Sequence, residues 1–322
     1  EKTIDFICLQ CEQPWWASVN IYDPHPPFNA PREYRDMFDP AQMPGALFRE
    51  SDLIEQDRLA CADFQSQVRR PEELDINNRY YSLEKDSPYG QGDVRLLQAA
   101  YAAMIKQVDD QLGRILDALE VSGQRDNTIV IFTSDHGEML GDHHLWRKTY
   151  AYEGSARIPF IVTPSQNVPQ SECKVADQVV ELRDIMPTVL DIARLEIPKT
   201  EEGKSVLHLL NKESNGSWRN YIHGEHCTCY SQEQEMQYVT NGKRKLIWLP
   251  RIDEMQFFNL DTDPGECNNL IDDPNYQAEV SKWKSYLIDE LADRNCNWVK
   301  DGELISPPPA GPLVSPYKNC LL

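Results

Sequence analysis

The sequence has no long apolar run and no excess of positive charge, and each absence excludes a class of protein. A membrane-spanning helix needs about 18 or more consecutive apolar residues, and none of the 322 residues lies in such a run. Lys and Arg number 32 against 52 Asp and Glu, which gives a formal net charge of −20. Nucleic acid binds to Lys- and Arg-rich surfaces, so it is not expected as a partner, whereas a small anionic substrate remains compatible with a local site.

Targeting and zinc-binding patterns are also missing. No signal peptide is visible, so the compartment is left open, and residue 1 need not be the natural start of the chain. The nine cysteines include Cys8 with Cys11 and Cys227 with Cys229, two pairs that are far apart in the sequence. Because structural zinc sites gather such pairs in a compact segment, free thiols are favoured, with one or two disulfides as the alternative.

The pattern of apolar residues predicts an α/β fold for the first part of the chain. Helices are expected at residues 1–13, 95–119 and 179–195, the second with apolar residues at helical spacing along one face. Strands are expected at residues 15–22, 128–133 and 158–162. The wholly apolar run at residues 128–133 is typical of a central parallel strand that is covered on both faces. This alternation predicts a mixed, largely parallel sheet sandwiched by helices.

The pattern changes towards the C-terminus. Short strands at residues 236–241, 245–249 and 256–260, with Asn241-Gly242 as a hairpin turn, precede a helix at residues 275–291. We therefore assign residues 1–220 to an α/β domain, residues 221–295 to a small antiparallel α+β subdomain, and residues 296–322 to a Pro-rich C-terminal arm. Such an arm is a candidate contact for a homo-oligomer.

A dense group of polar, chemically active residues follows the apolar strand at residues 128–133. Asp135 and His136 come just after it, where open α/β sheets place their ligand sites, and Gly137 allows a sharp turn. The same loop continues with Asp142, His143, His144 and Lys148. An adjacent carboxylate and imidazole are able to face one cation, but from these residues alone a polar surface loop with capping acids is an equal alternative.

The same segment resembles the second signature region of the sulfatases and of the related phosphonate and phosphate-ester hydrolases in the alkaline phosphatase superfamily. The matching parts are Ser-Asp-His-Gly at residues 134–137, Gly-Asp-His at 141–143, Lys148, and Tyr-Glu-Gly-Ser-Ala-Arg-Ile-Pro at 152–159. The resemblance implies an alkaline phosphatase-like fold in which Asp135 and His136 ligate a divalent cation and Lys148 binds the sulfate or phosphate group. It also implies a structural role for Glu153 and Arg157, as an ion pair behind the loop.

Two further segments extend the resemblance. The Asp-Pro-His-Pro-Pro-Phe run at residues 23–28 is similar to a family turn whose histidine contacts the substrate, which implies that His25 binds the substrate or protonates the leaving oxygen. Residues 256–270 are similar to a structural signature of the family's C-terminal subdomain. His226, placed after a predicted strand, is a further candidate for the substrate pocket, the alternative being a satisfied histidine at a subdomain junction.

The family's nucleophile has no counterpart in the sequence. Sulfatases use a formylglycine made from Cys or Ser in a Cys/Ser-x-Pro-x-Arg motif, and no Cys or Ser here fits it. The resemblance implies that the formylglycine and the paired aspartates of the metal site belong to an N-terminal part outside this sequence. A hard cation prefers about six oxygen-rich ligands, so Asp135 and His136 alone are expected to bind it weakly and the chain alone to be inactive. Calcium is the expected ion, with manganese or magnesium as alternatives; the imidazole of His136 leaves room for a softer ion such as manganese.

The implied function of the full-length protein is a sulfuric-ester hydrolase that acts on an aryl or carbohydrate sulfate. A phosphonate monoester or phosphodiester hydrolase is the alternative, because that subgroup shares the His-Pro-Pro turn, the Asp-His pair and the Gly-Asp-His-His-Leu run. A third alternative, from another class, is a non-catalytic fragment or pseudoenzyme that only binds. In the first two cases the partner is a small ester, whose pocket walls are expected chiefly in residues 29–92.

Overall fold

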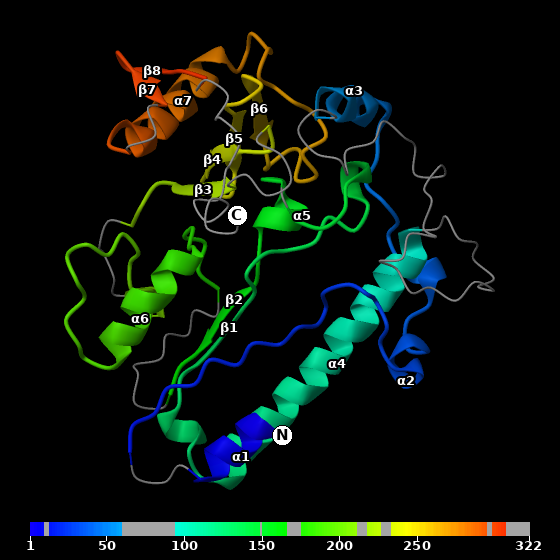
Figure 1. Ribbon diagram of the computed structural model, residues 1–322, viewed down its shortest axis with the longest axis vertical. Helices are drawn as coiled ribbons and strands as arrows, with labels where there is room; N and C mark the ends of the chain where they lie inside the picture. Colours follow the sequence, from blue (N-terminus) through cyan, green and yellow to red (C-terminus); the bar gives the residue numbers. More distant parts are fainter. Residues whose placement is uncertain are drawn as a thin grey trace, which may run out of the picture.

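The longest element of the computed structural model is helix α4 (Val94–Val121), which lies along one side of the molecule (Figure 1). The model describes residues 1–9, 13–59, 94–148, 150–165, 175–210, 218–226, 233–294 and 298–306. The short helices α1 (Lys2–Leu9), α2 (Arg32–Arg35) and η1 (Pro40–Gln42) pack against α4. The helix predicted at residues 95–119 is confirmed, and Gly123 follows its end in the left-handed region, at φ +70°.

The apolar stripe of α4 is covered by the segment that follows the first Pro-rich turn. The core between them is formed by Phe28, Ala30, Leu97, Ala100, Ala103 and Met104. Phe28 is 2% exposed and meets Tyr101 edge-on, with 5.6 Å between the ring centres. This packing fixes the position of the turn that carries His25.

Strands β1 (Val130–Thr133) and β2 (Phe160–Thr163) form a two-stranded antiparallel sheet. Within the described ranges every paired strand is antiparallel, so the parallel neighbours predicted for residues 128–133 are not among them. The neighbour that is described, β2, is antiparallel because residues 134–159 reverse the chain and return it beside β1, whereas a parallel neighbour needs a crossover connection. An apolar run shows that a strand is to be covered, and leaves the direction of its neighbour open.

The segment at residues 15–22 differs from its prediction as a buried strand. It is extended but pairs with no strand of the described residues, and in Figure 1 it runs as the blue trace between α4 and the β1–β2 pair. Trp16 is 62% exposed and Tyr22 68% exposed. Aromatic and β-branched residues favour a strand only where a neighbouring strand takes up the backbone hydrogen bonds, and here that neighbour is not among the described residues.

The region between the two sheets contains a second helical segment. The 3₁₀ turn η5 (Leu182–Asp184) leads directly into α6 (Ile185–Ile192), within the helix predicted at residues 179–195. Pro187 lies in the first turn of α6, where its missing N–H removes no hydrogen bond from the helix. The turns η3 (Arg125–Asn127) and η6 (Leu207–Leu210) complete the connections.

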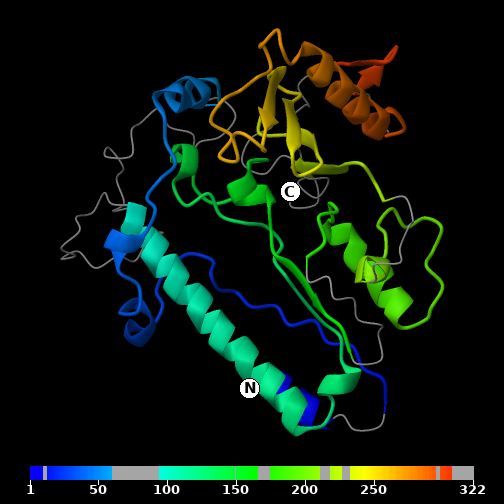
Figure 2. The same ribbon diagram turned by 180° about the vertical axis from the view of Figure 1, so that it is seen from behind.

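The C-terminal part forms a four-stranded antiparallel sheet in chain order, at the opposite end of the molecule from α1 (Figures 1 and 2). Its strands are β3 (Ile222–His226), β4 (Met236–Thr240), β5 (Arg244–Leu249) and β6 (Glu254–Asn259). The last three, with the β4–β5 hairpin at Gly242 (φ +79°), are confirmed predictions. His226 was expected to follow a strand and is instead the last residue of β3 itself, because residues 222–226 pair with β4 over five positions.

The two faces of this sheet have different covers. Helix α7 (Gln277–Ala292) covers one face, with Trp248, Phe257, Trp283, Leu287 and Trp298 in the shared core. The other face packs on the loop that follows β1, through Met139, Leu145, Tyr152, Ile247 and Phe258. The subdomain is therefore built onto the segment that carries the signature residues.

The first residues of the predicted C-terminal arm pack on the subdomain. A short hairpin of β7 (Val299–Lys300) and β8 (Glu303–Leu304) follows the buried Trp298, and Val299 and Leu304 join the same core as α7. Residues 307–322, on which the predicted oligomer contact depends, lie outside the described residues. In the described part of the chain, no helix combines the length and the apolar character needed to cross a membrane.

Candidate active site

The loop at residues 134–148, here called the signature loop, starts at the end of β1 and is seated on the one-turn helix α5 (Glu153–Ala156). The Gly137 amide donates to the Ser155 carbonyl at 2.7 Å, and the Glu138 amide donates to the Gly154 carbonyl at 2.8 Å. A Cβ atom on Gly137 would lie 2.2 Å from the Gly154 oxygen. Only glycine allows this approach, so Gly137 is required for close backbone contact as well as for the turn.

The two predicted metal ligands are adjacent residues and directly precede Gly137, where the loop is hydrogen-bonded to α5. The Asp135 side chain is 84% exposed, and its Oδ2 lies 3.5 Å from Nε2 of His136. Nδ1 of His136 is 2.8 Å from the Gly137 carbonyl, which only accepts, and the neutral tautomer that donates from Nδ1 to this carbonyl has Nε2 available as a ligand. A carboxylate oxygen beside an unprotonated imidazole nitrogen is a donor set that suits a divalent cation.

Two side chains alone would supply only part of the coordination shell of a divalent cation. Among the described residues, no group of three or more His, Cys, Asp or Glu side chains is placed to hold a metal ion. The residues present fit a cation as two of its ligands, and the assignment of Asp135 and His136 stays a prediction.

Lys148 lies at the far end of the signature loop, which is closed at its base. The Met139 amide donates to the Arg147 carbonyl at 2.9 Å, and the Arg147 amide donates back to the Glu138 carboxylate. Burial raises the pKa of Glu138, while the charges of Arg147 and Lys148 act in the opposite direction. Lys148 therefore lies near Glu138 at the base of the loop that also carries Asp135.

His25 lies in a separate Pro-rich turn. Nδ1 of His25 is 2.7 Å from the Pro26 carbonyl, and its ring stands 4.8 Å from that of Tyr22. The peptide bonds before Pro24 and Pro27 are cis. Among the described residues, the hydrogen bond and the ring contact of His25 stay within its own turn and involve no residue of the signature loop, so its role at the substrate stays a prediction.

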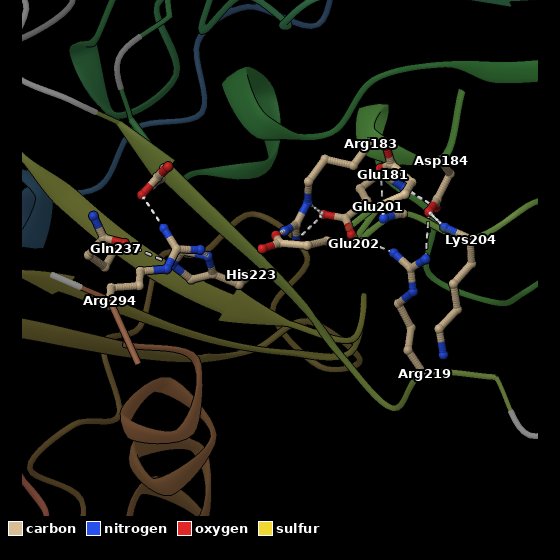
Figure 3. Close-up of polar contacts among 12 residues, drawn as sticks. Glu181, Arg183, Asp184, Glu201, Glu202, Lys204, Arg219, His223, Gln237 and Arg294 are labelled. Carbon is tan, nitrogen blue, oxygen red and sulfur yellow. Dashed lines mark hydrogen bonds and ion pairs between the residues drawn. The ribbon is translucent and has the colours of Figure 1, made fainter. Parts of the chain in front are cut away.

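His226 is the last residue of β3 and pairs with Met236 in the sheet. This places it in the C-terminal subdomain, next to Cys227 and Cys229, which lie outside the described residues. Its assignment to the substrate pocket also stays a prediction. The nearby His223 is held by hydrogen bonds within the subdomain: its Nε2 donates to Gln237 at 2.8 Å and its Nδ1 faces Arg294 at 3.2 Å (Figure 3).

No role was predicted for Lys245, a residue of β5 that the structure places beside Glu153 of α5. Its side chain is 0% exposed, and Nζ lies 2.7 Å from Glu266 and 2.8 Å from Glu153. The Glu153 amide in turn donates to Glu266 at 2.6 Å. The predicted pair of Glu153 with Arg157 is present at 3.8 Å, but Arg157 is 80% exposed and so contributes little. The structural role predicted for Glu153 thus depends mainly on a buried lysine from β5.

A second group of charges surrounds the start of α6 (Figure 3). The fully buried Asp184 accepts the amide of Lys204 at 2.8 Å and an ion pair from Arg219. Arg219 also pairs with Glu181, which the half-buried guanidinium of Arg183 contacts at 2.9 Å. These ion pairs are satisfied within the group, so we assign them to the stability of the fold.

The described residues thus form an α/β protein in which a loop at the end of a strand carries an adjacent aspartate and histidine and, at its far end, a lysine. Comparison with known proteins narrows this class. The family model described as Sulfatase matches residues 1–195, and the model described as N-sulphoglucosamine sulphohydrolase, C-terminal, matches residues 141–293. The chain belongs to the sulfatase family.

Individual relatives agree with this membership. The chain is 35% identical to an arylsulfatase of Clostridium perfringens, over 97% of this chain and 61% of that protein. It is 28% identical to a multifunctional alkaline phosphatase superfamily protein of Trinickia caryophylli, over 92% of this chain and 58% of that protein. It therefore spans about six tenths of the length of these curated relatives.

A solved structure gives the same fold. The phosphonate monoester hydrolase of Agrobacterium radiobacter superposes with a TM-score of 0.75 at 25% identity, covering 95% of this chain and 63% of that one. The predicted alkaline phosphatase-like α/β fold with a small C-terminal subdomain is thereby confirmed.

Proposed function

We propose that this chain forms the cation- and oxyanion-binding part of a sulfuric-ester hydrolase. The observation that carries the proposal is the closed signature loop, which holds Asp135 and His136 at one end and Lys148 at the other. Asp135 and His136 would hold a divalent cation, for which calcium is our first expectation and manganese or magnesium the alternatives. When bound, such a cation stabilises negative charge on the ester oxygens.

The remaining roles follow from charge and donor chemistry. The Lys148 ammonium would pair with the anionic oxygens of the ester, and His25 would contact the substrate and deliver a proton to the leaving oxygen. His226 would line the pocket from the subdomain. The attacking group would be a formylglycine, which we propose is supplied by a part of the protein that this sequence does not include.

Sulfate is favoured over phosphonate by the comparisons. The arylsulfatase relative is 35% identical over nearly the whole chain, whereas the phosphonate monoester hydrolase structure is 25% identical. Because the second subgroup shares the signature residues of the first, these residues do not separate the two ester classes. Phosphonate monoester hydrolysis is therefore the competing assignment to be tested directly.

The test compares an aryl sulfate and a phenyl phosphonate monoester as substrates of the purified full-length enzyme, which is also the protein used in the binding experiments below. We expect faster turnover of the sulfate, and loss of activity in both Asp135→Asn and Lys148→Ala. Arg157→Ala is the matched control, because Arg157 belongs to the same motif and is 80% exposed, and it should keep activity near that of wild type. Faster phosphonate turnover would refute the sulfatase assignment.

Calcium titration by calorimetry tests the metal assignment separately. Asp135→Asn should weaken calcium binding strongly, whereas Lys148→Ala should leave it close to wild type because an ammonium group is no ligand. An Asp135→Asn protein that binds calcium as tightly as wild type would show that the cation lies elsewhere.

A further inference from the structure

We propose that the buried pair of Asp52 and His143 is a positioning device for Lys148. Asp52 belongs to helix α3 (Glu50–Leu59), and His143 lies at the tip of the signature loop in the 3₁₀ turn η4 (Asp142–His144). By holding the tip, the pair sets where the far limb of the loop presents the Lys148 ammonium. The inference rests on the proposed function of Lys148 as the anion-binding residue and adds to it the part of the structure that makes it effective.

The signature loop has a backbone that needs to be held in place. Leu140, His143 and Arg147 all have positive φ values, of 48°, 55° and 68°, and none of them is glycine. Such conformations persist only where surrounding contacts determine them. Contacts that hold this loop are therefore required for the conformation that presents Lys148.

Four of these contacts lie at the tip and come from residues 47–56. The His143 ring donates from Nδ1 to Asp52 at 3.0 Å, with the two side chains only 9% and 5% exposed. The His143 amide donates to the Leu47 carbonyl at 2.7 Å, and the Leu47 amide donates to Asp142 at 2.9 Å. The Gln56 amide group donates to the His143 carbonyl at 2.5 Å. The tip is thus fixed through both side chain and backbone.

The connection from the tip to Lys148 runs along the loop itself. The Gly141 amide donates to the Leu145 carbonyl at 3.0 Å, and the Met139 amide donates to the Arg147 carbonyl at 2.9 Å. These bonds make the limbs of the loop one connected unit, and Lys148 is the next residue after Arg147. A displaced tip is therefore expected to displace Lys148.

The cation ligands are held by other contacts. Asp135 and His136 precede Gly137, whose amide is bonded to Ser155 of the α5 segment and not to residues 47–56. Loss of the Asp52–His143 pair should consequently weaken anion binding while cation binding persists. A general loss of structure would weaken both.

The environment of His143 decides which variants are informative. Its ring stacks on Tyr152, with 4.9 Å between ring centres, and both rings line a cavity of about 50 Å³ together with Glu266 and Cys267. His143→Phe keeps a stacking ring and removes the hydrogen bond to Asp52. His143→Asn gives up the stacking and keeps an N–H donor close to the position of Nδ1, so it serves as the conservative rescue.

The experiment measures binding of inorganic sulfate, by calorimetry and as inhibition of turnover, in the enzyme saturated with calcium. We expect His143→Phe to weaken sulfate binding about tenfold and to raise KM more than it lowers kcat, with calcium affinity unchanged. His143→Asn should recover most of the loss. In a Lys148→Ala background, His143→Phe should have little further effect on sulfate binding, because its action passes through Lys148.

Each outcome decides between the inference and the proposed function. If Lys148→Ala leaves sulfate binding unchanged, the proposed function of Lys148 fails. If Lys148→Ala weakens sulfate binding and His143→Phe does not, only the positioning role fails. The positioning role is also overturned if His143→Phe weakens sulfate and calcium binding equally. The same holds if His143→Phe keeps its full effect in the Lys148→Ala background. Should His143→Phe not fold, Asp52→Asn carries the same expectation, since it removes the charge that His143 contacts.

Discussion

The buried ammonium of Lys245 gives the sharpest prediction about stability. It lies between the sheet of the C-terminal subdomain and the start of α5, 2.7 Å from Glu266 and 2.8 Å from Glu153. It also donates to the Ala151 carbonyl at 2.7 Å. Replacement of Lys245 by methionine keeps the length of the side chain and removes its charge. The two carboxylates then face each other across the interface without a cation.

The expected cost follows from how deeply each partner is buried. The Glu266 side chain is 2% exposed and cannot be solvated in place, whereas that of Glu153 is 22% exposed and regains some contact with water. Removing one partner of a buried ion pair costs about 3 to 5 kcal/mol. We expect Lys245→Met to lower the free energy of unfolding by an amount in this range, with Glu266 responsible for most of it.

Urea unfolding followed by tryptophan fluorescence measures this loss, because Trp248 and Trp283 report from the core of the same subdomain. The double variant Lys245→Met/Glu266→Gln should be more stable than Lys245→Met, since no buried charge is left unpaired and glutamine still accepts the Glu153 amide. Lys284→Met is the surface control.

Lys284 pairs with Glu303 at 3.0 Å, with side chains 34% and 69% exposed, so its loss should cost less than about 1 kcal/mol. The reasoning is refuted if Lys245→Met costs no more than this control. It is also refuted if the double variant is no more stable than the single one, because the unpaired carboxylate would then not be the source of the loss.

Two other predictions concern backbone packing and pH. Gly137→Ala places a Cβ 2.2 Å from a backbone oxygen, so it should destabilise the fold and weaken cation binding. Gly113→Ala is the control: no atom outside the adjoining turns of the helix lies within 4 Å of the added Cβ, and the change should stabilise α4 by up to about 1 kcal/mol. Thermal unfolding and calcium titration of both variants check these expectations. Burial and the charge of Arg294 lower the pKa of His223, so the unfolded chain takes up a proton more readily and stability should fall as the pH drops below the ordinary value of 6.5. His223→Gln should reduce this dependence in urea unfolding at several pH values, and an unchanged pH dependence would contradict the assignment.

Much of this protein was determined by local sequence patterns. Helical spacing over residues 95–119 predicted α4, because a helix of that length is specified by the residues that form its own buried face. Asn241-Gly242 predicted the β4–β5 hairpin, because the turn geometry is a property of the two residues. The motif from residue 134 to residue 159 likewise predicted the family and the loop that carries Asp135, His136 and Lys148.

The tertiary structure decided those features that depend on partners far away in the chain. Whether β1 pairs parallel or antiparallel with β2 depends on how the chain returns, and the exposure of residues 15–22 depends on which strands lie beside them. Asp52 meets His143 across 91 residues, and Lys245 of β5 meets Glu153 of α5. No local pattern encodes such pairs, because a charge is buried only when the fold brings its counterion to it. The signature loop is therefore predictable as a motif, while the contacts that hold it in shape are set by the packing of the whole chain.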